Sequence, residues 1–209
     1  MKKVMPKINN VRDNDIMSSY KDNYFESSRY KENVNGYLEL NHTEINSCIF
    51  EKIDFSNIKL TDVSLYDVIF DSCDLSNQCF DTRYINRVIF KNCKLLGTSF
   101  MGTYIKDTTF DNCILKYSNF SNAEINNIFI ENSDLSETGF IESKIKDISF
   151  DKDNLYRAEF VMVNLNNVDF SNCEISNTIF DSKSLKGIIV DMYQCKFLVG
   201  MLGVKIKED

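Results

Sequence analysis

Large apolar residues occupy every fifth position over most of the chain. The series runs from Leu40 to Val190 without an insertion or a deletion, and its 31 members are all Leu, Ile, Val or Phe. A period of five matches neither the period of about 3.6 residues in a helix nor the two-residue period of a strand. The pattern therefore predicts a backbone that turns a corner every five residues.

The position two residues before each large residue is mostly small or β-branched, as at Val63, Cys73, Thr98 and Ala123. The other three positions of each five are largely Asp, Asn, Ser, Lys and Glu. We therefore expect one large and one small side chain of every five to point into a core, while the other three face water.

The repeat is longer than five. Phe dominates at the multiples of ten, Leu or Ile stands at the intervening fives, and Cys73, Cys93 and Cys113 recur at intervals of twenty. Four faces of five residues would make a square coil, and stacked coils would lie about 4.8 Å apart. The sequence thus predicts an all-β solenoid of roughly 7.5 coils between residues 40 and 190.

Asn is frequent where the corners of such a coil would lie. Asn tolerates the left-handed conformation that some turns require. The predicted turn asparagines are Asn57, Asn77, Asn92, Asn112, Asn122, Asn127, Asn132, Asn167, Asn172 and Asn177.

Three segments of the repeat resemble a known family pattern. Asp74-Leu75-Ser76, Asn119-Phe120-Ser121 and Cys173-Glu174-Ile175-Ser176-Asn177 look like the A(D/N)LXX motif of the pentapeptide-repeat family. The resemblance spans about 150 of the 209 residues. It implies a right-handed quadrilateral β-helix.

The chain divides into three segments. Residues 1–36 are polar, carry seven basic and five acidic side chains and show no ladder, so they are predicted to form an N-terminal arm or cap, or a segment that recruits a partner. Residues 37–190 form the predicted β-helix. Residues 191–209 are predicted to form a helix, with Asp191 as its N-cap and Gly203 as its stop, followed by a short strand at 204–206.

The C-terminal segment has apolar residues at helical spacing. An open solenoid end exposes unpaired backbone and must be covered. The segment is similar to the C-terminal ending of Qnr and MfpA-type pentapeptide proteins, and that similarity implies a homodimer; a helix that only caps the coil remains the alternative. The candidate dimer or cap residues are Tyr193, Phe197, Leu198, Met201 and Leu202.

Composition narrows the class of protein. Hydrophobic residues make up 43% of the chain, which excludes a wholly disordered protein, and the net charge of −7 argues against direct nucleic-acid binding. No apolar run approaches the ~20 residues of a membrane helix, and no signal peptide is recognisable. Seven cysteines without a CxxC motif favour reduced thiols, so we expect a cytoplasmic protein that does not bind membranes.

The sequence carries no constellation of catalytic residues. The single histidine, His42, is expected at a surface turn, and no metalloprotease, phosphate-loop or nucleophile-elbow motif occurs. Cysteines stacked about 4.8 Å apart in an apolar core would not converge on a zinc ion. We therefore expect no enzyme activity, no cofactor and no metal site.

Acidic residues gather in columns on the predicted coil. Residues 37–190 hold 23 acidic and 14 basic side chains. Stacking places many of the acidic residues along one corner and the next face, where they would form a stripe for a basic partner; a merely soluble surface is the alternative. The stripe residues are Glu51, Asp54, Asp71, Asp74, Asp111, Glu131, Asp134 and Asp151.

A second column is apolar and borders the acidic corner. Ile49, Ile69, Ile89 and Phe129 immediately precede ladder residues of one face, so their side chains are predicted to point outward. Exposed apolar strips often mark interfaces. The alternative is that they tuck under neighbouring side chains or under the N-terminal arm.

The resemblance implies a function that the residues alone do not. Qnr and MfpA-type proteins imply an acidic rod that binds DNA gyrase or topoisomerase IV as a DNA mimic and modulates it or protects it from quinolone-like poisons. Many protective Qnr proteins carry loops that project from the coil, whereas this ladder has no insertion from 40 to 190, so the inhibitory kind of action is favoured. A scaffold module for an unknown protein partner is the alternative function.

Overall fold

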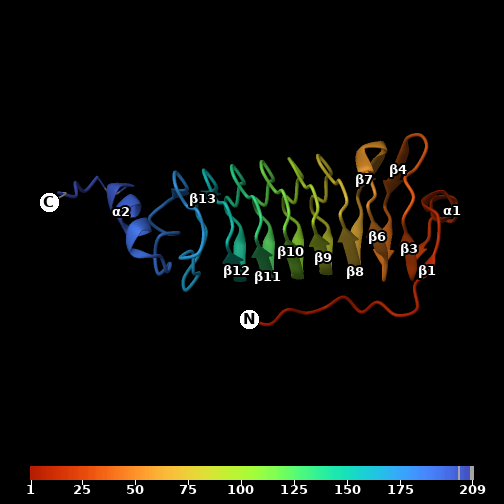
Figure 1. Cartoon of the computed structure of the whole chain (residues 1–209), viewed down its shortest axis with the longest axis horizontal. Helices are drawn as coiled ribbons and strands as arrows, with labels where there is room; N and C mark the ends of the chain where they lie inside the picture. The colour runs from red at the N-terminus through yellow and green to blue at the C-terminus, as the bar shows by residue number, and fades with distance from the viewer. Residues whose placement is uncertain (202, 208–209) are drawn as a thin grey trace.

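The computed structural model describes residues 1–201 and 203–207, and it is a rod of stacked coils (Figure 1). Strands of successive coils lie side by side along the rod. Helix α1 (Ile16–Asp22) lies at one end and helix α2 (Met192–Met201) at the other. The predicted quadrilateral β-helix with a short C-terminal helix is confirmed.

One parallel sheet runs along most of the rod. Its main path is β1 (Arg12–Asp13), β3 (Ser28–Tyr30), β6 (Ile49–Glu51), β8 (Ser64–Asp71), β9 (Tyr84–Lys91), β10 (Tyr104–Asp111), β11 (Glu124–Glu131) and β12 (Lys144–Asp151), with β2 (Phe25–Glu26) and β5 (Glu44–Asn46) joined beside it. Two further pairs lie on other faces: β4 (Leu38–Asn41) with β7 (Ile58–Thr61), and β13 (Glu159–Phe160) with β14 (Ile179–Phe180). A short 3₁₀ turn, η1 (Phe55–Asn57), precedes β7.

The register of this sheet is twenty residues per coil. Phe70 pairs with Phe90, and Phe90 with Phe110. The interval is still twenty at the end of the coil, where Asp169 pairs with Ile189. A local slip occurs only where β12 joins β11, at the pair Asn126 and Asp147, and it is recovered by Ile148. The predicted twenty-residue square coil is therefore confirmed.

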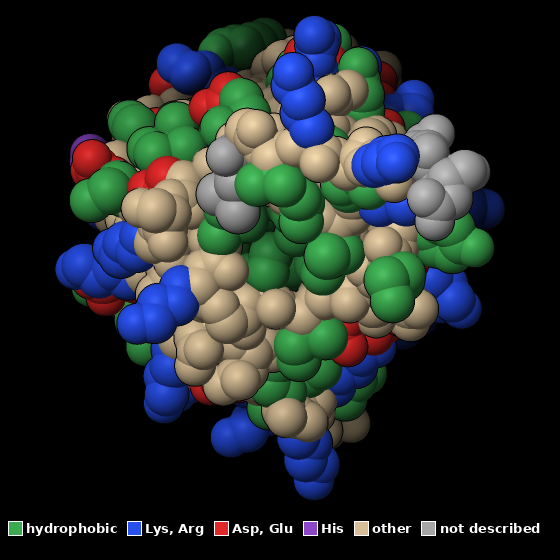
Figure 2. All heavy atoms as spheres, turned by 90° about the vertical axis from the view of Figure 1, so that its left-hand side faces the viewer, with side chains coloured by type: hydrophobic (Ala, Val, Ile, Leu, Met, Phe, Trp, Pro, Cys, Tyr) green, Lys and Arg blue, Asp and Glu red, His purple; other side chains and the backbone are tan. Residues whose placement is uncertain are grey.

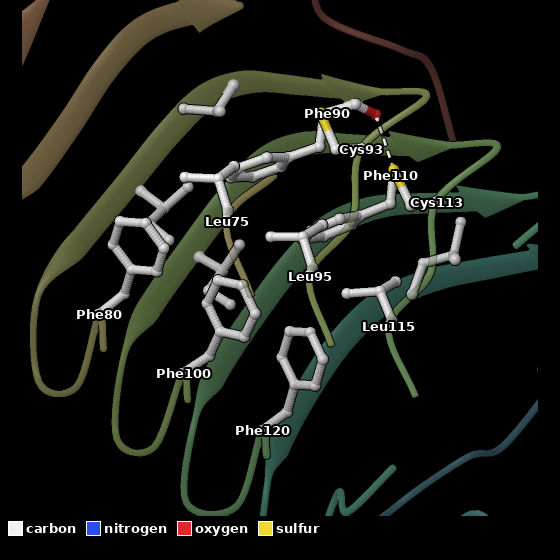
Figure 3. Close-up of a cluster of buried hydrophobic side chains, with 14 of the residues drawn as sticks. Leu75, Phe80, Phe90, Cys93, Leu95, Phe100, Phe110, Cys113, Leu115 and Phe120 are labelled. Atoms are coloured by element: carbon white, nitrogen blue, oxygen red, sulfur yellow. Dashed lines mark hydrogen bonds between the residues drawn. The ribbon is translucent and has the colours of Figure 1, made fainter. Parts of the chain in front are cut away.

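The core consists of stacked columns of identical side chains (Figure 3). The rings of Phe70 and Phe90 stack with centroids 5.2 Å apart, and those of Phe100 and Phe120 with centroids 4.6 Å apart. Across the coil the two phenylalanine columns meet edge to face, as in the pair Phe110 and Phe120 at 6.1 Å. Both geometries suit the quadrupole of an aromatic ring, so the columns add attraction to simple burial.

Inward hydroxyls are satisfied by backbone carbonyls of the preceding coil. Thr98 Oγ1 donates to the Leu75 carbonyl at 2.9 Å, and Ser118 Oγ donates to the Leu95 carbonyl at 2.8 Å. Both Thr98 and Ser118 are fully buried. Because a buried donor without a partner is costly, this repeated bond explains why Ser and Thr are tolerated at the small inward position.

Most corners have a left-handed residue two positions after the ladder residue. Positive φ angles recur at these positions, for example 59° at Asn77 and 54° at Asn92. Eight of the ten predicted turn asparagines adopt this conformation; Asn57 lies in η1 instead, and Asn172 has no positive φ. Asn pays a smaller penalty there than other side chains, which explains its frequency.

The coil begins earlier than the sequence indicated. Phe25 pairs with Ile45, and Tyr30 pairs with Phe50 and stacks on its ring at 4.8 Å. The boundary predicted between residues 36 and 37 therefore falls inside the first coil. Tyr30 escapes the ladder pattern because a hydroxyl-bearing ring occupies the Phe position, and residue 35 is an Asn.

Helix α1 covers this first coil. Its Ile16 and Ser19 are buried, and Ser19 Oγ shares a 2.8 Å hydrogen bond with the Tyr30 hydroxyl. At the other end of the rod, the short strand predicted at 204–206 is wrong. These residues lie beyond α2 and have no regular secondary structure, because a strand requires a hydrogen-bonded neighbour.

Candidate partner-binding surfaces

The first acidic column stands in register on one corner of the rod. Glu51 pairs with Asp71, and further along the same column Asp111 pairs with Glu131 and Glu131 with Asp151. Lys91 interrupts the column between Asp71 and Asp111. The five acidic residues are half-buried. The structure therefore aligns the predicted residues in one column, with one carboxylate in every coil except the coil of Lys91.

The second acidic column lies on the next face. Isolated parallel bridges join Asp54 to Asp74 and Asp134 to Asn154, with Lys94 and Ile114 between these two pairs. Lys94 Nζ is 3.5 Å from Asp74 Oδ2, which partly neutralises that position. The column is therefore real but less acidic than its carboxylates alone indicate.

Several carboxylates of the second column are tied to the corner backbone. Asp74 Oδ1 accepts the Ser76 N–H at 3.1 Å, and Asp134 Oδ1 accepts the Ser136 N–H at 3.0 Å. Partial burial works to raise the pKa of Asp74, but hydrogen bonds from Ser76 and the charge of Lys94 outweigh it, so the pKa is lowered from its ordinary value. The Asp74 carboxylate is accordingly charged at neutral pH and held in place.

The apolar strip also stacks in register. Ile49 pairs with Ile69, Ile69 with Ile89, and Thr109 with Phe129. Thr109 takes the strip position between Ile89 and Phe129 and is itself buried, whereas the four predicted residues are half-buried. The strip is thus partly covered, and the structure shows what lies beside it.

Residues 1–8 run as an extended arm along the outside of the rod (Figure 1). Lys7 N–H donates to Asp67 Oδ1 at 2.7 Å, and Asn127 Nδ2 donates to the Lys2 carbonyl at 3.0 Å. Lys3 Nζ reaches Glu131 Oε2 at 2.6 Å and lies 5.7 Å from the centre of the Phe129 ring. The arm therefore lies on the corner that carries Asp67 and Asn127, beside the apolar strip, and only its Lys3 side chain reaches across to the first acidic column.

One alternative drawn from the sequence placed the apolar strip under the N-terminal arm, and the position of Lys3 over the Phe129 ring agrees with it, but the extended course of the arm was not predicted. The signal was present, because half-buried Val4, Pro6 and Ile8 alternate with exposed Met5 and Lys7. Such an alternation is typical of an extended segment with one face on a surface. It was too short to stand out beside the five-residue ladder.

The arm rests on a polar corner column. The members of this column are Ser47, Asp67, Arg87, Asp107 and Asn127, each with a positive φ. Arg87 donates from Nε and Nη2 to the two oxygens of Asp67, both at 2.6 Å. Burial works to raise the pKa of Asp67, yet the hydrogen bonds from Arg87 and from the Lys7 N–H prevail and lower that pKa. Asp67 is therefore an ionised, oriented acceptor beneath the arm.

Helix α2 closes the C-terminal end of the coil through one glutamine. Gln194 Nε2 donates to the Phe170 and Cys173 carbonyls, each at 2.8 Å. Gln194 N–H donates to Asp191 Oδ1 at 2.7 Å, and Gln194 Oε1 accepts the Asp191 N–H at 2.9 Å. This reciprocal pair is a capping box, so Asp191 occupies the predicted N-cap position and Gln194 also covers open carbonyls of the last coil.

The apolar side chains of α2 are largely uncovered. Tyr193 is 84% exposed and Met201 is 39% exposed, whereas Phe197 and Leu198 are half-buried and Leu198 packs against the core. Leu202 lies outside the described residues. Viewed along the rod onto this end, hydrophobic side chains gather in the centre of the face, with lysines around the rim (Figure 2). The structure thus supports a cap and leaves an apolar face for a second function.

The cysteines of the core behave as small apolar residues. Cys93 Sγ donates to the Phe70 carbonyl at 3.4 Å, and Cys113 Sγ to the Phe90 carbonyl at 3.3 Å (Figure 3). Burial raises the pKa of Cys48 and of Cys173 to about 11. Cys48 and Cys173 are therefore protonated packing groups, whereas Cys79 and Cys195 are exposed.

Other candidate chemistry is sparse in the part of the chain that the structure describes. His42 lies at an exposed corner, where Nδ1 faces the Asp62 carboxylate. No cluster of three or more His, Cys, Asp or Glu side chains with metal-binding geometry occurs among the described residues. None of the helices in residues 1–201 and 203–207 is long and apolar enough to cross a membrane.

Comparison with solved structures agrees with this architecture. A trypsin-treated variant of QnrB1, a plasmid-mediated fluoroquinolone resistance protein, is 23% identical over 87% of this chain and 89% of that chain, with a TM-score of 0.50. Full-length QnrB1 is 22% identical over 86% and 89% of the two chains, with a TM-score of 0.41. A pentapeptide-repeat protein from the cyanobacterium Cyanothece 51142 is 15% identical over 52% and 64%, with a TM-score of 0.29.

Family models match the repeat itself. The model of the pentapeptide repeat region matches residues 63–140, and the model of eight pentapeptide-repeat copies matches residues 39–77. No curated protein matches the chain. The five-residue ladder, the twenty-residue coil and these matches agree, and the chain belongs to the pentapeptide-repeat family.

Proposed function

We propose that this protein is a non-enzymatic acidic rod that binds a type II topoisomerase, DNA gyrase or topoisomerase IV, by occupying its basic DNA-binding groove. Binding would modulate the enzyme or protect it from quinolone-like poisons. The observation that carries the proposal is the pair of in-register carboxylate columns along one side of the rod.

The spacing of the columns supports a partial imitation of DNA. Each column offers at most one carboxylate per coil, about every 4.8 Å, whereas duplex DNA carries one charge per ~1.7 Å of axis. Residues 37–190 hold 23 acidic and 14 basic side chains, a net of −9. The rod is therefore a weaker polyanion than DNA, and its binding depends on shape as well as charge.

The comparisons and the uninterrupted coil help to distinguish inhibition of the topoisomerase from its protection. QnrB1 is described as a fluoroquinolone resistance protein, and this chain shares its fold. The register is twenty residues from Phe25 to Ile189 apart from the local slip at Asp147, so no loop is inserted between coils. We therefore propose inhibition of the topoisomerase as the main effect, with protection as the weaker outcome.

The test is a gyrase supercoiling and DNA-cleavage assay with the purified protein, with and without a quinolone. We expect inhibition or protection at low micromolar protein. Reversing four stripe charges, with Asp71→Lys, Asp74→Lys, Asp111→Lys and Glu131→Lys, should remove the effect. If the wild-type protein has no effect at tens of micromolar, the proposal is wrong for gyrase.

The matched control reverses four acidic side chains that lie off the stripe. Glu44→Lys, Glu124→Lys, Glu137→Lys and Glu142→Lys change the net charge by the same amount. This variant should retain most of the effect on the topoisomerase. Equal loss in both variants would show that only total charge matters and would contradict a defined stripe.

We also propose that two copies associate through the uncovered face of α2. Tyr193 and Met192, 84% and 80% exposed, would lie at the centre of such an interface. A two-fold dimer would place two rods end to end and lengthen the acidic stripe, which suits a long DNA-binding groove.

Scaffolding through the apolar strip is the second candidate function. It is favoured by the in-register stacking of Ile49, Ile69 and Ile89 on the rod surface. Ile69→Asp and Ile89→Asp should abolish partner capture in that case and leave topoisomerase inhibition unchanged. DNA mimicry predicts the opposite pattern of sensitivity.

A further inference from the structure

The N-terminal arm is a separate ligand of the rod surface rather than part of the coil. Its residues 1–8 form no strand, and the first ladder contact of the chain is β1 at Arg12–Asp13. The arm is hydrogen-bonded to side chains of the rod, namely those of Ser47, Asp67, Asn127 and Glu131. A segment held in this way can leave without breaking the sheet.

The geometry shows that the arm crosses the strands along the rod axis. Its contacts span from Asp67 to Asn127, which is three coils or about 14 Å at the usual strand spacing. On the arm the same contacts lie on Lys7 and Lys2, and five extended residues reach about 17 Å at most. The arm is therefore almost fully extended, and its backbone is free to bond with the rod's corner side chains.

The surface beneath the arm matches an extended cationic peptide in two ways. Asp67 accepts a backbone N–H and Asn127 donates to a backbone carbonyl, so this surface contacts the main chain of the arm at both ends. Glu131 takes an ammonium group beside the Phe129 ring, which is also attractive to a cation. Half-buried aliphatic side chains at every second residue of the arm face the rod.

We propose that this surface, formed by the column Ser47 to Asn127 and the apolar strip beside it, is a docking site for an extended cationic segment of a partner protein, and that residues 1–8 are its built-in competitor. The partner segment carries an aliphatic residue at every second position and Lys or Arg between them. Because the arm is tethered at β1, it competes at a high effective concentration and keeps the docking surface covered until the partner displaces it. This site does not require that gyrase is the partner.

The experiment uses the full chain with substitutions in the arm. Val4→Asp with Ile8→Asp removes two half-buried aliphatic anchors and should release the arm. Met5→Asp with Asn9→Asp makes the same charge change at exposed positions and serves as the matched control. The probe is a fluorescent synthetic peptide with the sequence of residues 1–9, and its binding is measured by anisotropy.

We expect the peptide to bind the released-arm variant at least tenfold more tightly than it binds the wild type or the matched control. Ile69→Asp added to the released-arm variant should abolish that binding, and a scrambled peptide of the same composition should bind at least fivefold more weakly. Trypsin should cleave after Lys7 faster in the released-arm variant than in the control, which reports arm release independently of the peptide.

Two results would overturn the proposal. One is equal binding to all three proteins, which would show non-specific attraction to an acidic surface. The other is a released-arm variant that trypsin cleaves readily but that does not bind the peptide. That result would show that the docking surface does not bind an extended peptide. Both results are independent of the gyrase assay, so failure of either proposal leaves the other testable.

Discussion

The helices at the two ends of the rod differ in how much of their surface is buried against the coil. Helix α1 buries Ile16 and Ser19 and bonds to the first coil through Tyr30. Helix α2 is longer, yet none of its residues 192–201 is fully buried, and Tyr193 is almost wholly exposed. A cap that only protected the coil would bury its apolar residues, whereas α2 leaves an apolar face open at the C-terminal end, and the proposed dimer would cover that face.

The coils also differ in regularity along the rod. Strands β8 to β12 have eight residues each, whereas β13 and β14 have two each. The register slips where β12 joins β11, and just beyond that slip the column of small inward residues holds Asp153 in place of the cysteines at 73, 93 and 113. The central coils, from β8 to β12, are thus more regular than the C-terminal ones.

The largest expected effect tests the N-terminal cap. Ile16→Ala should lower the free energy of unfolding by about 2–5 kcal/mol, because it leaves a cavity where a 3% exposed side chain packed. Urea unfolding followed by circular dichroism measures the change. Met17→Ala, at the adjacent 37% exposed position, should change stability by less than about 0.5 kcal/mol. Equal effects at both sites would contradict the view that α1 is a packed cap.

The next effect concerns the buried carboxyl at the start of the irregular region. Burial raises the pKa of Asp153 to about 7, although its oxygens accept the Ser133 N–H at 2.8 Å and the Asp151 N–H at 3.1 Å. The nearby carboxylates of Asp151 and Glu131 raise that pKa further. Between pH 4 and 7 the folded protein therefore holds a proton that the unfolded chain has lost. Stability should fall as pH rises across this window and level off above it.

Asp153→Ser should remove that pH dependence. A serine there can accept the Ser133 N–H, as Ser133 Oγ accepts the Cys113 N–H in the preceding coil. At pH 8 we expect the variant to be about 2–4 kcal/mol more stable than the wild type, and at pH 4 the gain should vanish. Urea titrations at several pH values give the dependence of the unfolding free energy on pH for the wild type and for the variant. Asp151→Ser, on the surface, should leave the fall of stability with rising pH unchanged. A wild-type protein whose stability does not fall between pH 4 and 7 would contradict the raised pKa of Asp153.

A third prediction tests the open C-terminal face directly. Met192→Asp with Tyr193→Asp should convert a dimer into a monomer, while the stability of each protomer changes by no more than about 0.5 kcal/mol. Light scattering after size-exclusion chromatography measures the mass. The matched change on the other cap, Met17→Asp with Tyr20→Asp, alters side chains that are 37% and 38% exposed and should leave the dimer intact. A wild-type protein that is monomeric at 100 µM would exclude this interface.

The smallest effect is a gain at one corner of the C-terminal coils. Met162 has a φ of 61°, a conformation that disfavours its side chain, whereas comparable N-terminal corners hold Asn77 and Asn92. Met162→Asn should raise the free energy of unfolding by about 0.5–1 kcal/mol. Thermal unfolding is sensitive enough to detect it. Met101→Asn, at a similarly exposed position without a positive φ, should bring no gain.

The repeat and its core follow from the sequence alone. A large apolar residue at every fifth position and a small one two before it determine which side chains point inward, because only a four-cornered coil keeps both sets in the core. The alignment of Glu51 with Asp71, or of Ile49 with Ile69, follows from the same twenty-residue period without any further information. The alignment of the acidic columns and of the apolar strip along the rod could therefore be predicted from the sequence.

Features without a period were decided by the tertiary structure. The first coil was missed because Tyr30 breaks the Phe pattern, although its ring stacks on Phe50 as a Phe would. The course of residues 1–8 depends on contacts with Asp67 and Asn127, which lie 60 and 125 residues away along the chain. A local pattern cannot specify such distant partners. The sequence therefore determined the rod, while only the folded chain decided that its own arm lies along the rod surface beside the apolar strip.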